Sequence, residues 1–297
     1  MGVVNVTPDS FSDGGQFLDP ERATEHGLSL IEQGADVLDV GGESTRPGAA
    51  PVAAEEELRR ILPVIEALSA RGGAPISVDT TKAEVARRAV EAGARIVNDI
   101  SGGLADPRMI PTVARLREDH DVFLVLMHRQ GAPESMQSAP RYADALAEVG
   151  GCLRERMEAA LAAGIPPNRL ALDPGIGFGK SLEHNLQLLR GLSELRALGP
   201  PLLLGVSRKS FIGHITGEER AADWKAASQR RAPAQRERIG GTAAALALAV
   251  STGSADILRV HDVAIMREAA LVAAAIGPSQ RLAARSLTGH PGPRATD

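Results

Sequence analysis

The residues of this chain that are best suited to chemistry lie in short polar or glycine-rich clusters, each following a short apolar run. Arg46 lies in a glycine-flanked loop, and the adjacent cations Arg208 and Lys209 follow another run, so both places can bind phosphate or carboxylate oxygens. A plain surface arginine is the alternative for Arg46. The clusters occupy residues 5–15, 41–48, 79–82, 98–103, 127–128, 173–180, 207–213 and 259–262.

Three clusters begin with a side chain that can hydrogen-bond the edge of a heterocycle. Asp79 and Asn98 each stand at the end of a predicted strand, and an amide such as Asn98 both donates and accepts hydrogen bonds. A structural helix N-cap is the alternative for Asp79. Asp173 opens a glycine-rich turn, where a buried carboxylate needs paired donors.

The turn 173–180 leads into the tripeptide Gly-Lys-Ser at residues 179–181, which also occurs in nucleotide-binding loops. A P-loop requires glycine where Pro174 stands, and a dinucleotide-binding fingerprint requires glycine where Lys180 stands. We therefore interpret this segment as a turn that lets a ligand approach the backbone closely.

Three further residues suggest a site for a phosphorylated ligand. Arg259 and His261 alternate along one predicted strand, so their side chains share a face and favour anion binding, although a lone histidine is more often structural. Asn5 ends the first strand and can offer its carbonyl oxygen to Mg²⁺, with loop capping as the alternative. The cluster 5–15 ends in Gly-Gly and predicts a mobile loop over the site.

The apolar runs alternate with longer segments of helical periodicity, a pattern that predicts parallel βα units. Glycines just before four strands predict helix ends in the left-handed conformation, at Gly34, Gly93, Gly164 and Gly253. The predicted strands are 3–6, 36–40, 76–78, 95–97, 122–126, 170–172, 202–205 and 257–260. The predicted helices are 21–33, 53–70, 83–92, 107–117, 142–163, 182–192, 239–252 and 264–276.

Eight such units predict an α/β fold, a closed (β/α)8 TIM barrel forming a single domain over residues 1–276, because only a barrel brings all the strand ends to one face. An open doubly wound sheet, the alternative, would bind its ligand at one switch point. The charged segment 217–238 predicts a solvated, Arg-rich insertion after the seventh strand. Residues 277–297 predict a disordered tail.

Composition argues against several classes of protein. A net charge of −4 and an aromatic content of 2% disfavour a nucleic-acid partner. No run of eighteen apolar residues occurs, so no membrane association is expected. Cys152 is the only cysteine, which excludes an internal disulfide and favours a cytoplasmic location.

Together and in this order, the clusters resemble the dihydropteroate synthases of the folate pathway, through residues 5–15, 43–48, 173–180, 207–213 and 259–263. The resemblance extends from residue 1 to about residue 276. It implies a transferase that condenses 6-hydroxymethyl-7,8-dihydropterin diphosphate with p-aminobenzoate, giving 7,8-dihydropteroate and pyrophosphate in the presence of Mg²⁺. It also implies a homodimer formed through helices far from the substrates.

The resemblance further implies a role for each matching residue. The implied catalytic residues are Asp79, Lys209, Arg259 and His261. The implied pterin pocket comprises Asp79, Asn98, Ile100, Met127, Asp173, Phe178, Gly205, Lys209 and Arg259. The diphosphate would be bound by Asn5, Arg259 and His261, with Asn5 as the metal ligand. The p-aminobenzoate and the loops around it would involve Phe11, Asp13, Thr45, Arg46, Pro47, Phe178, Lys209 and Ser210.

The family is thought to lose pyrophosphate early, leaving a cation on the pterin that the arylamine attacks, and Asp79 would stabilise that positive charge. A corrinoid-dependent pterin-binding methyltransferase should lack the loops at 45–47 and 207–209, and a catalytically silent paralogue should have lost a site residue. Two features depart from the family pattern: the longer segment 217–238, and a start almost within the first strand, which is consistent with a trimmed or misassigned beginning.

Overall fold

The computed structural model describes residues 1–7, 19–45, 48–131, 136–137, 140–217 and 238–277 of the chain. Its strands are β1 (Gly2–Asn5), β2 (Leu38–Gly41), β3 (Ile76–Asp79), β4 (Ile96–Asp99), β5 (Phe123–Met127), β6 (Leu170–Asp173), β7 (Leu203–Leu204) and β8 (Ile257–Leu258). Its helices are α1 (Pro20–Glu32), α2 (Ala54–Arg71), α3 (Ala83–Glu91), α4 (Met109–Asp119), α5 (Ala145–Ala162), α6 (Leu182–Arg190), α7 (Leu192–Arg196), α8 (Ser210–Thr216), α10 (Ile239–Ser251) and α11 (Val263–Ile276), with a 3₁₀ turn at Pro167–Arg169.

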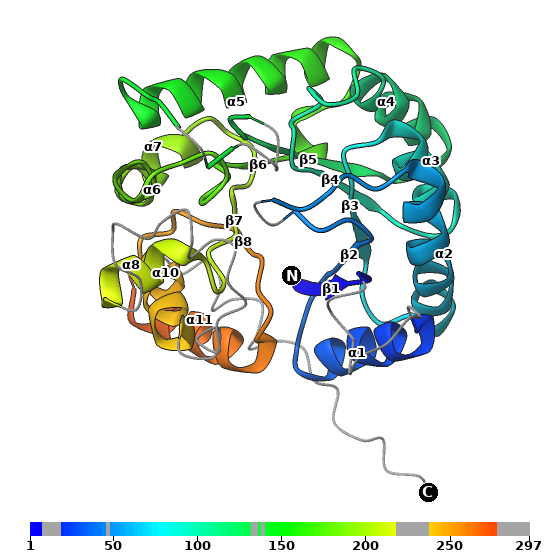
Figure 1. The fold of residues 1–297 in the computed structure, drawn as a ribbon, viewed down its shortest axis with the longest axis horizontal. Helices are drawn as coiled ribbons and strands as arrows, with labels where there is room; N and C mark the ends of the chain where they lie inside the picture. The colour runs from blue at the N-terminus through cyan, green and yellow to red at the C-terminus, as the bar shows by residue number, and fades with distance from the viewer. Residues whose placement is uncertain (8–18, 46–47, 132–135, 138–139, 218–237, 278–297) are drawn as a thin grey trace, which may run out of the picture.

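The strands close into a ring of parallel neighbours. β1 to β6 pair in sequence order, and β7 pairs with β8. Two isolated parallel bridges join these parts, one between Leu172 and Leu202 and one between Gly2 and Val260. The amide of Val3 also donates to the Val260 carbonyl at 3.1 Å. Figure 1 shows the helices arranged around this ring, so the predicted (β/α)8 barrel is confirmed.

Apolar side chains pack on both surfaces of the ring. The larger core lies between the strands and the surrounding helices and includes Leu38, Val40 and Val78, each fully buried. A smaller cluster of Val125, Ala171 and Leu203 is covered by Met1, Ile96 and Ile257. Since these residues come from β4 to β8 and the start of the chain, this cluster fills the interior of the barrel, as side chains do in closed barrels of this size.

Two of the predicted helices begin or end differently in the structure. The helix predicted over 142–163 starts only at Ala145, because the Asp144 side chain caps it by accepting from the amides of Leu146 and Ala147 at 3.0 and 3.1 Å. The helix predicted over 182–192 is divided at Gly191, where a Cβ would lie 2.3 Å from a methyl of Leu146.

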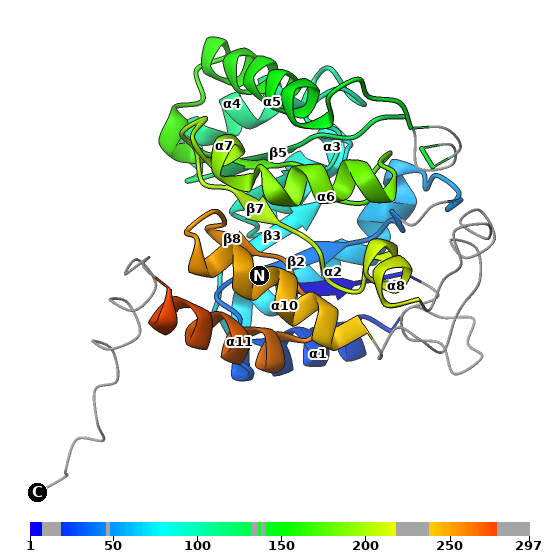
Figure 2. The same ribbon diagram turned by 90° about the vertical axis from the view of Figure 1, so that its left-hand side faces the viewer.

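The helix α8 was not predicted at all, because the sequence after β7 was interpreted only as a polar cluster. In side view α8 lies at one end of the barrel, beyond β7 (Figure 2). The four glycines predicted to end helices all have positive φ, from 66° to 123°, and this prediction is confirmed. Most of the predicted insertion and of the tail, residues 218–237 and 278–297, lies outside the described residues. Within the described part, no helix is both long and apolar enough to span a bilayer.

The turn after β6 requires glycine at residue 175. Gly175 has a φ of +64°, and a Cβ there would lie 1.9 Å from the carbonyl oxygen of His128. We expect Gly175→Ala to lower the free energy of unfolding by at least about 2 kcal/mol, since it adds both backbone strain and overlap. Urea denaturation measures this change. Gly164→Ala is the matched control: its φ is +92° but its Cβ would meet nothing within 4 Å. A control that destabilises as much as Gly175→Ala would contradict the explanation by overlap.

Candidate active site

The ends of the first four strands lie side by side in register. Asn5 is paired with Gly41, Gly41 with Asp79, and Asp79 with Asn98. Side chains two residues apart along a strand share a face. Asn98 therefore shares the interior face with Ile96, which belongs to the apolar cluster within the barrel. Asp79 and Asn98 therefore lie one layer above that cluster.

Arg259, just after β8, is the centre of this polar layer. Its Nε donates to Asp39 Oδ2 at 2.6 Å, and its Nη2 donates to Asp79 Oδ2 at 2.7 Å. The Asn98 amide nitrogen donates to the same Asp39 oxygen at 3.1 Å. Four strands are thus linked across the interior by one guanidinium and two carboxylates.

Burial determines the charge balance of this layer. Burial raises the pKa of Asp79 to about 7; the Arg259 guanidinium opposes this rise, and the Asp39 and Glu57 carboxylates add to it. Burial also works against the charge on Arg259, but Asp39 and Asp79 more than offset it, so its pKa is raised above the ordinary value. The guanidinium therefore stays charged, while Asp79 titrates near neutral pH.

Two acceptor oxygens in this layer have no donor among the described residues. Asp39 Oδ1 and Asn98 Oδ1 are buried, and no described residue donates to either of them. A buried acceptor without a donor is costly. An N–H donor brought into this layer would lower that cost.

A second cluster of charged residues lies where β6 and β7 end. Asp173 Oδ1 accepts from the amide of Gly175 at 2.6 Å. The Lys209 ammonium donates to the carbonyl of Ile176 and lies 4.6 Å from the centre of the Phe178 ring. Burial raises the pKa of Asp173, with Lys209 acting in the opposite direction. Burial lowers the pKa of Lys209 to about 8, and Asp173 opposes that change.

The two cations that are adjacent in sequence after β7 point to different partners. Arg208 donates through Nε and Nη2 to the carboxylate of Asp262, at 2.9 and 2.5 Å. Lys209 instead donates to the Ile176 carbonyl and lies near the Phe178 ring, as described above. A Cβ placed on Gly205 would lie 3.8 Å from the Lys209 ammonium and 3.9 Å from Cβ of Arg259, so Gly205 leaves room between them.

His261 is held by the strand end next to it. Its Nδ1 lies 3.0 Å from the Ser207 hydroxyl oxygen, and its backbone amide donates to the same oxygen at 3.2 Å. This places the histidine on the side of the barrel where β7 and β8 end, two residues beyond Arg259.

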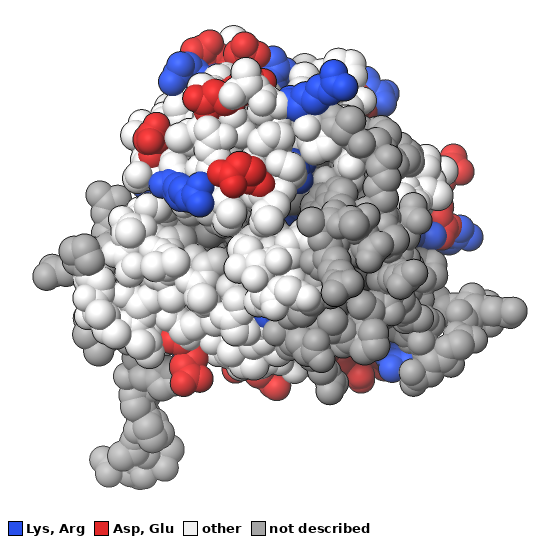
Figure 3. Space-filling model, turned by 60° about the vertical axis from the view of Figure 1, so that its left-hand side comes forward, with Lys and Arg blue, Asp and Glu red and all other residues white. Residues whose placement is uncertain are grey.

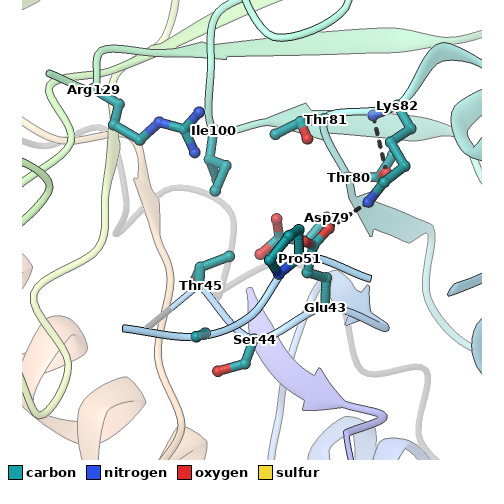
Figure 4. A pocket seen from close by; sticks show the side chains of 11 residues that line it. Glu43, Ser44, Thr45, Pro51, Asp79, Thr80, Thr81, Lys82, Ile100 and Arg129 are labelled. Atoms are coloured by element: carbon teal, nitrogen blue, oxygen red, sulfur yellow. Dashed lines mark hydrogen bonds and ion pairs between the residues drawn. The ribbon is translucent and has the colours of Figure 1, made fainter. Parts of the chain in front are cut away.

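A cavity of about 190 Å³ opens beside Asp79. Figure 4 shows Thr45, Ile100 and Arg129 around it, so loops after three further strands contribute to its wall. Lys82 closes one side: its ammonium contacts the Glu43 carboxylate, and it donates to Glu57 at 2.6 Å. The other lining residues are Ser44, Ala49, Pro51, Thr80 and Thr81.

Comparison with known proteins shows where this arrangement belongs. A family model described as pterin binding enzyme matches residues 1–261. The dihydropteroate synthase of Mycobacterium leprae is 48% identical over 265 residues, which cover 89% of this chain and 88% of that protein. The chain belongs to the dihydropteroate synthase family.

Two solved structures extend the comparison. The dihydropteroate synthase of Xanthomonas albilineans with 4-aminobenzoic acid has a TM-score of 0.80 and is 49% identical, covering 93% of this chain and 91% of that one. The same organism's enzyme in complex with 7,8-dihydropteroate has a TM-score of 0.77 and is 47% identical, covering 93% and 92%. Members of the dihydropteroate synthase family are transferases of the folate pathway, and this activity, predicted from the sequence motifs, is confirmed.

The structure brings most of the predicted site residues of a dihydropteroate synthase to one end of the barrel. Asn5, Asp79, Met127 and Asp173 are the last residues of their strands. Asn98 lies one residue before the end of β4, and Ser210 is the first residue of α8. Thr45 and Ile100 line the cavity. The predicted contacts that lie outside the described residues are Phe11, Asp13, Arg46 and Pro47.

The alternative reading of Asp79 as a helix cap is wrong. The N-cap of α3 is Lys82, and the amide of Ala83 donates to Asp106 Oδ2 at 3.0 Å. Asp79 is thereby left to face Arg259.

The sequence interpretation missed Asp39, which is fully buried and bonded to both Arg259 and Asn98. A signal was present: Asp39 is an acidic residue between Leu38 and Val40 in a four-residue strand of a closed sheet. A carboxylate in such a strand requires a buried cation or donor, and Arg259 at the end of β8 is the available guanidinium.

We expect Arg259→Met to lower the free energy of unfolding by about 3 kcal/mol, because Asp39 and Asp79 would remain buried without their cation. The deficit should be larger at pH 8 than at pH 5. Without Arg259 the pKa of Asp79 rises further, so the folded state holds a proton that the unfolded state releases, and stability falls as pH rises. Denaturation at the two pH values measures this, with Arg190→Met, in an exposed pair with Glu183, as the control. Equal deficits at both pH values would contradict this account.

Proposed function

We propose that the residues around Arg259 carry out the condensation of 6-hydroxymethyl-7,8-dihydropterin diphosphate with p-aminobenzoate. The observation that supports this most directly is the position of Arg259 between Asp39 and Asp79, beside buried acceptors that no described residue satisfies. The relatives crystallised with 4-aminobenzoic acid and with 7,8-dihydropteroate support the same substrates and product.

In this proposal the pterin ring lies within the polar layer. The Asp173 carboxylate accepts from the ring N–H and the 2-amino group, which together present a pair of parallel donors like a guanidinium. The free oxygen of Asn98 accepts from a further ring N–H. Ile100 and Met127, both nearly fully buried, supply apolar contacts beside the ring. The heterocycle is therefore recognised by acceptors along its edge.

The diphosphate lies toward β7 and β8, where His261 and Arg259 supply positive charge or hydrogen-bond donors. Asn5, at the end of β1, is adjacent to this position because β1 is the neighbour of β8 in the closed ring. Lys209 lies between the ring and the opening, near Phe178. The leaving group is thus surrounded by donors before the bond breaks.

Bond changes then follow from this arrangement. The bond from the pterin methylene carbon to the diphosphate oxygen breaks, and its electron pair stays with the oxygen. The methylene and ring carry positive charge, which the ionised carboxylate of Asp79 stabilises at close range. The lone pair of the arylamine nitrogen forms the new carbon–nitrogen bond, and the nitrogen then loses a proton to water. Thr45, Phe178, Lys209 and Ser210 are the described residues proposed to surround the p-aminobenzoate.

The donor set fits a Mg²⁺ ion that arrives with the diphosphate. Among the described residues there is no group of three or more acidic, histidine or cysteine side chains able to hold a metal. Mg²⁺ commonly keeps several waters and takes only one or two protein oxygens together with substrate phosphates. The Asn5 amide oxygen can be such a ligand. When bound, the ion would neutralise charge on the departing oxygens.

The decisive assay mixes purified protein with the dihydropterin diphosphate, p-aminobenzoate and Mg²⁺, and follows pyrophosphate and dihydropteroate. Pyrophosphate release that requires both organic substrates and is lost on chelation with EDTA supports the proposal, including the metal. Tight pterin binding without any product would instead indicate a catalytically silent paralogue.

Asp79→Asn should retain pterin binding and lose most turnover, because the amide keeps the shape and hydrogen bonding but not the negative charge. Removing one group that stabilises the charge of a transition state commonly costs about 10²–10³ in kcat. In the wild type, kcat/KM should rise as pH increases through about 7, where Asp79 loses its proton. Steady-state rates across pH 5.5–8.5 and pterin titrations test both statements, and an unchanged rate in the variant would remove Asp79 from catalysis.

We also propose that the protein is a cytoplasmic homodimer formed through α10 and α11. These helices expose large apolar side chains at Leu248, Ile265, Val272 and Ile276, with exposed fractions from 47% to 80%. Residues 239–251 of α10 include no charged side chain. Figure 3 shows a broad area of few charges on this side of the molecule. An exposed apolar area of this kind typically indicates a protein interface.

Leu248→Glu should convert the dimer to a monomer, because it places a charge on the exposed apolar surface of α10. Sedimentation equilibrium measures the change. Leu161→Glu on α5, also at an exposed leucine, is the matched control and should remain dimeric. If the wild type is monomeric at micromolar concentration, the proposed interface is wrong.

A further inference from the structure

Lys180 is a fully buried lysine for which the mechanism above has no role. It ends the glycine-rich turn after β6, and none of its surface is exposed. Its ammonium lies 2.9 Å from His128 Nδ1, 3.0 Å from the Phe178 carbonyl oxygen and 3.4 Å from the His128 carbonyl oxygen. An ammonium has three donors, and the site presents three acceptors, none of them a carboxylate.

The acceptors come from two neighbouring strands. His128 follows Met127 at the end of β5, while Phe178 belongs to the turn after Asp173 at the end of β6. Met127 and Asp173 are themselves paired in register. Lys180 therefore connects the two loops that continue from this pair of residues.

The glycines of the turn bring these loops into direct contact. A Cβ on Gly175 would lie 1.9 Å from the His128 carbonyl oxygen, and one on Gly179 would lie 2.2 Å from that of Gln130. The Tyr142 hydroxyl also donates to the Gly179 carbonyl at 3.0 Å and so holds the turn in place. Inside the contact, carbonyl oxygens point inward and require donors, because burying them unsatisfied is costly.

The charges around Lys180 are consistent with a buried, weakly held proton. Burial lowers the pKa of Lys180 to about 7; Asp173 opposes this, Lys209 adds to it, and Cys152 has a small opposing effect. Burial, followed by the Lys180 charge, lowers the pKa of His128 to about 3. His128 is thus neutral at pH 7, and its Nδ1 accepts from Lys180 when the lysine carries its proton.

We propose that Lys180 is a positioning residue: its ammonium fixes the loops after β5 and β6 against each other, and thereby sets the spacing of Met127 and Asp173 for the pterin ring. This inference rests on the function proposed above. An apolar side chain of the same length would fill the space but would leave three acceptors without donors, and the loops would separate or admit water. The spacing of the two walls would then no longer match a planar ring.

Lys180→Met tests this, since methionine is similar in length and carries no donor. We expect the dissociation constant for the dihydropterin diphosphate, measured by calorimetry, to rise at least about 10-fold, while the KM for p-aminobenzoate at saturating pterin changes less than about twofold. Ile65→Val, in the outer core on α2, is a control for general destabilisation and should leave both constants unchanged. Equal pterin affinity in Lys180→Met and wild type would overturn the proposal.

A pH comparison provides a second measurement. In the unfolded chain the lysine holds its proton up to about pH 10.4, whereas the buried amine loses it at a lower pH, so the unfolded state binds more protons between these values. The free energy of unfolding of the wild type should therefore increase relative to that of Lys180→Met as pH rises from 7 to 9. A constant difference would mean that Lys180 does not titrate differently in the folded state and would contradict the buried contact.

If Lys180→Met does not fold, His128→Leu removes the Nδ1 acceptor from the other side and should also weaken pterin binding, with the KM for p-aminobenzoate again preserved. Wild-type affinity in this variant would count against the proposal. The wild-type condensation assay separates the two levels of inference: absence of dihydropteroate from the wild type refutes the proposed function, whereas product formation with unaltered variants refutes only the role of Lys180.

Discussion

The contact of Arg259 with two buried carboxylates is the constraint on which the rest of the site depends. A guanidinium is the one side-chain cation that stays charged when buried, and its planar donors can reach Asp39 and Asp79 from one position. The barrel must close for this contact to form, because Asp39 lies on β2, Asp79 on β3 and Arg259 just after β8. Folding and assembly of the site are therefore the same event.

Around this contact, burial in a surrounding of low polarity shifts the pKa of each charged group to a different extent. Asp79 is brought to titrate near pH 7, and Lys209 near pH 8, both chiefly through burial. Asp173 is also made harder to ionise, although Lys209 opposes that effect. The result is a pocket whose groups change charge in the physiological range, yet which keeps one permanent cation in Arg259. Such a pocket suits a reaction in which negative charge leaves and positive charge develops at neighbouring atoms.

Much of this organisation could be predicted from sequence, and the exceptions have physical causes. The eight strands and most helices were predictable because periodic apolar patterns and helix-ending glycines such as Gly93 act locally. The break at Gly191 depends on contact with Leu146, which lies far away in sequence. Asp39 was missed because its partner is 220 residues away. Burial of Lys180 could not be foreseen, since a lysine after glycines usually indicates an exposed turn, and only the packing of two loops encloses it.

The apolar cluster inside the barrel determines the route by which substrates and products reach and leave the site. Val125, Ala171 and Leu203, covered by Met1, Ile96 and Ile257, fill the interior below the polar layer, so the described part of the barrel is a packed core and not a pore. Both substrates must therefore enter, and both products must leave, through the same end of the barrel. The ligand that binds deepest has to bind first. A ligand bound nearer the open end has to dissociate before the deeper one can be released. The packed interior of the barrel thus dictates the order in which ligands bind and are released.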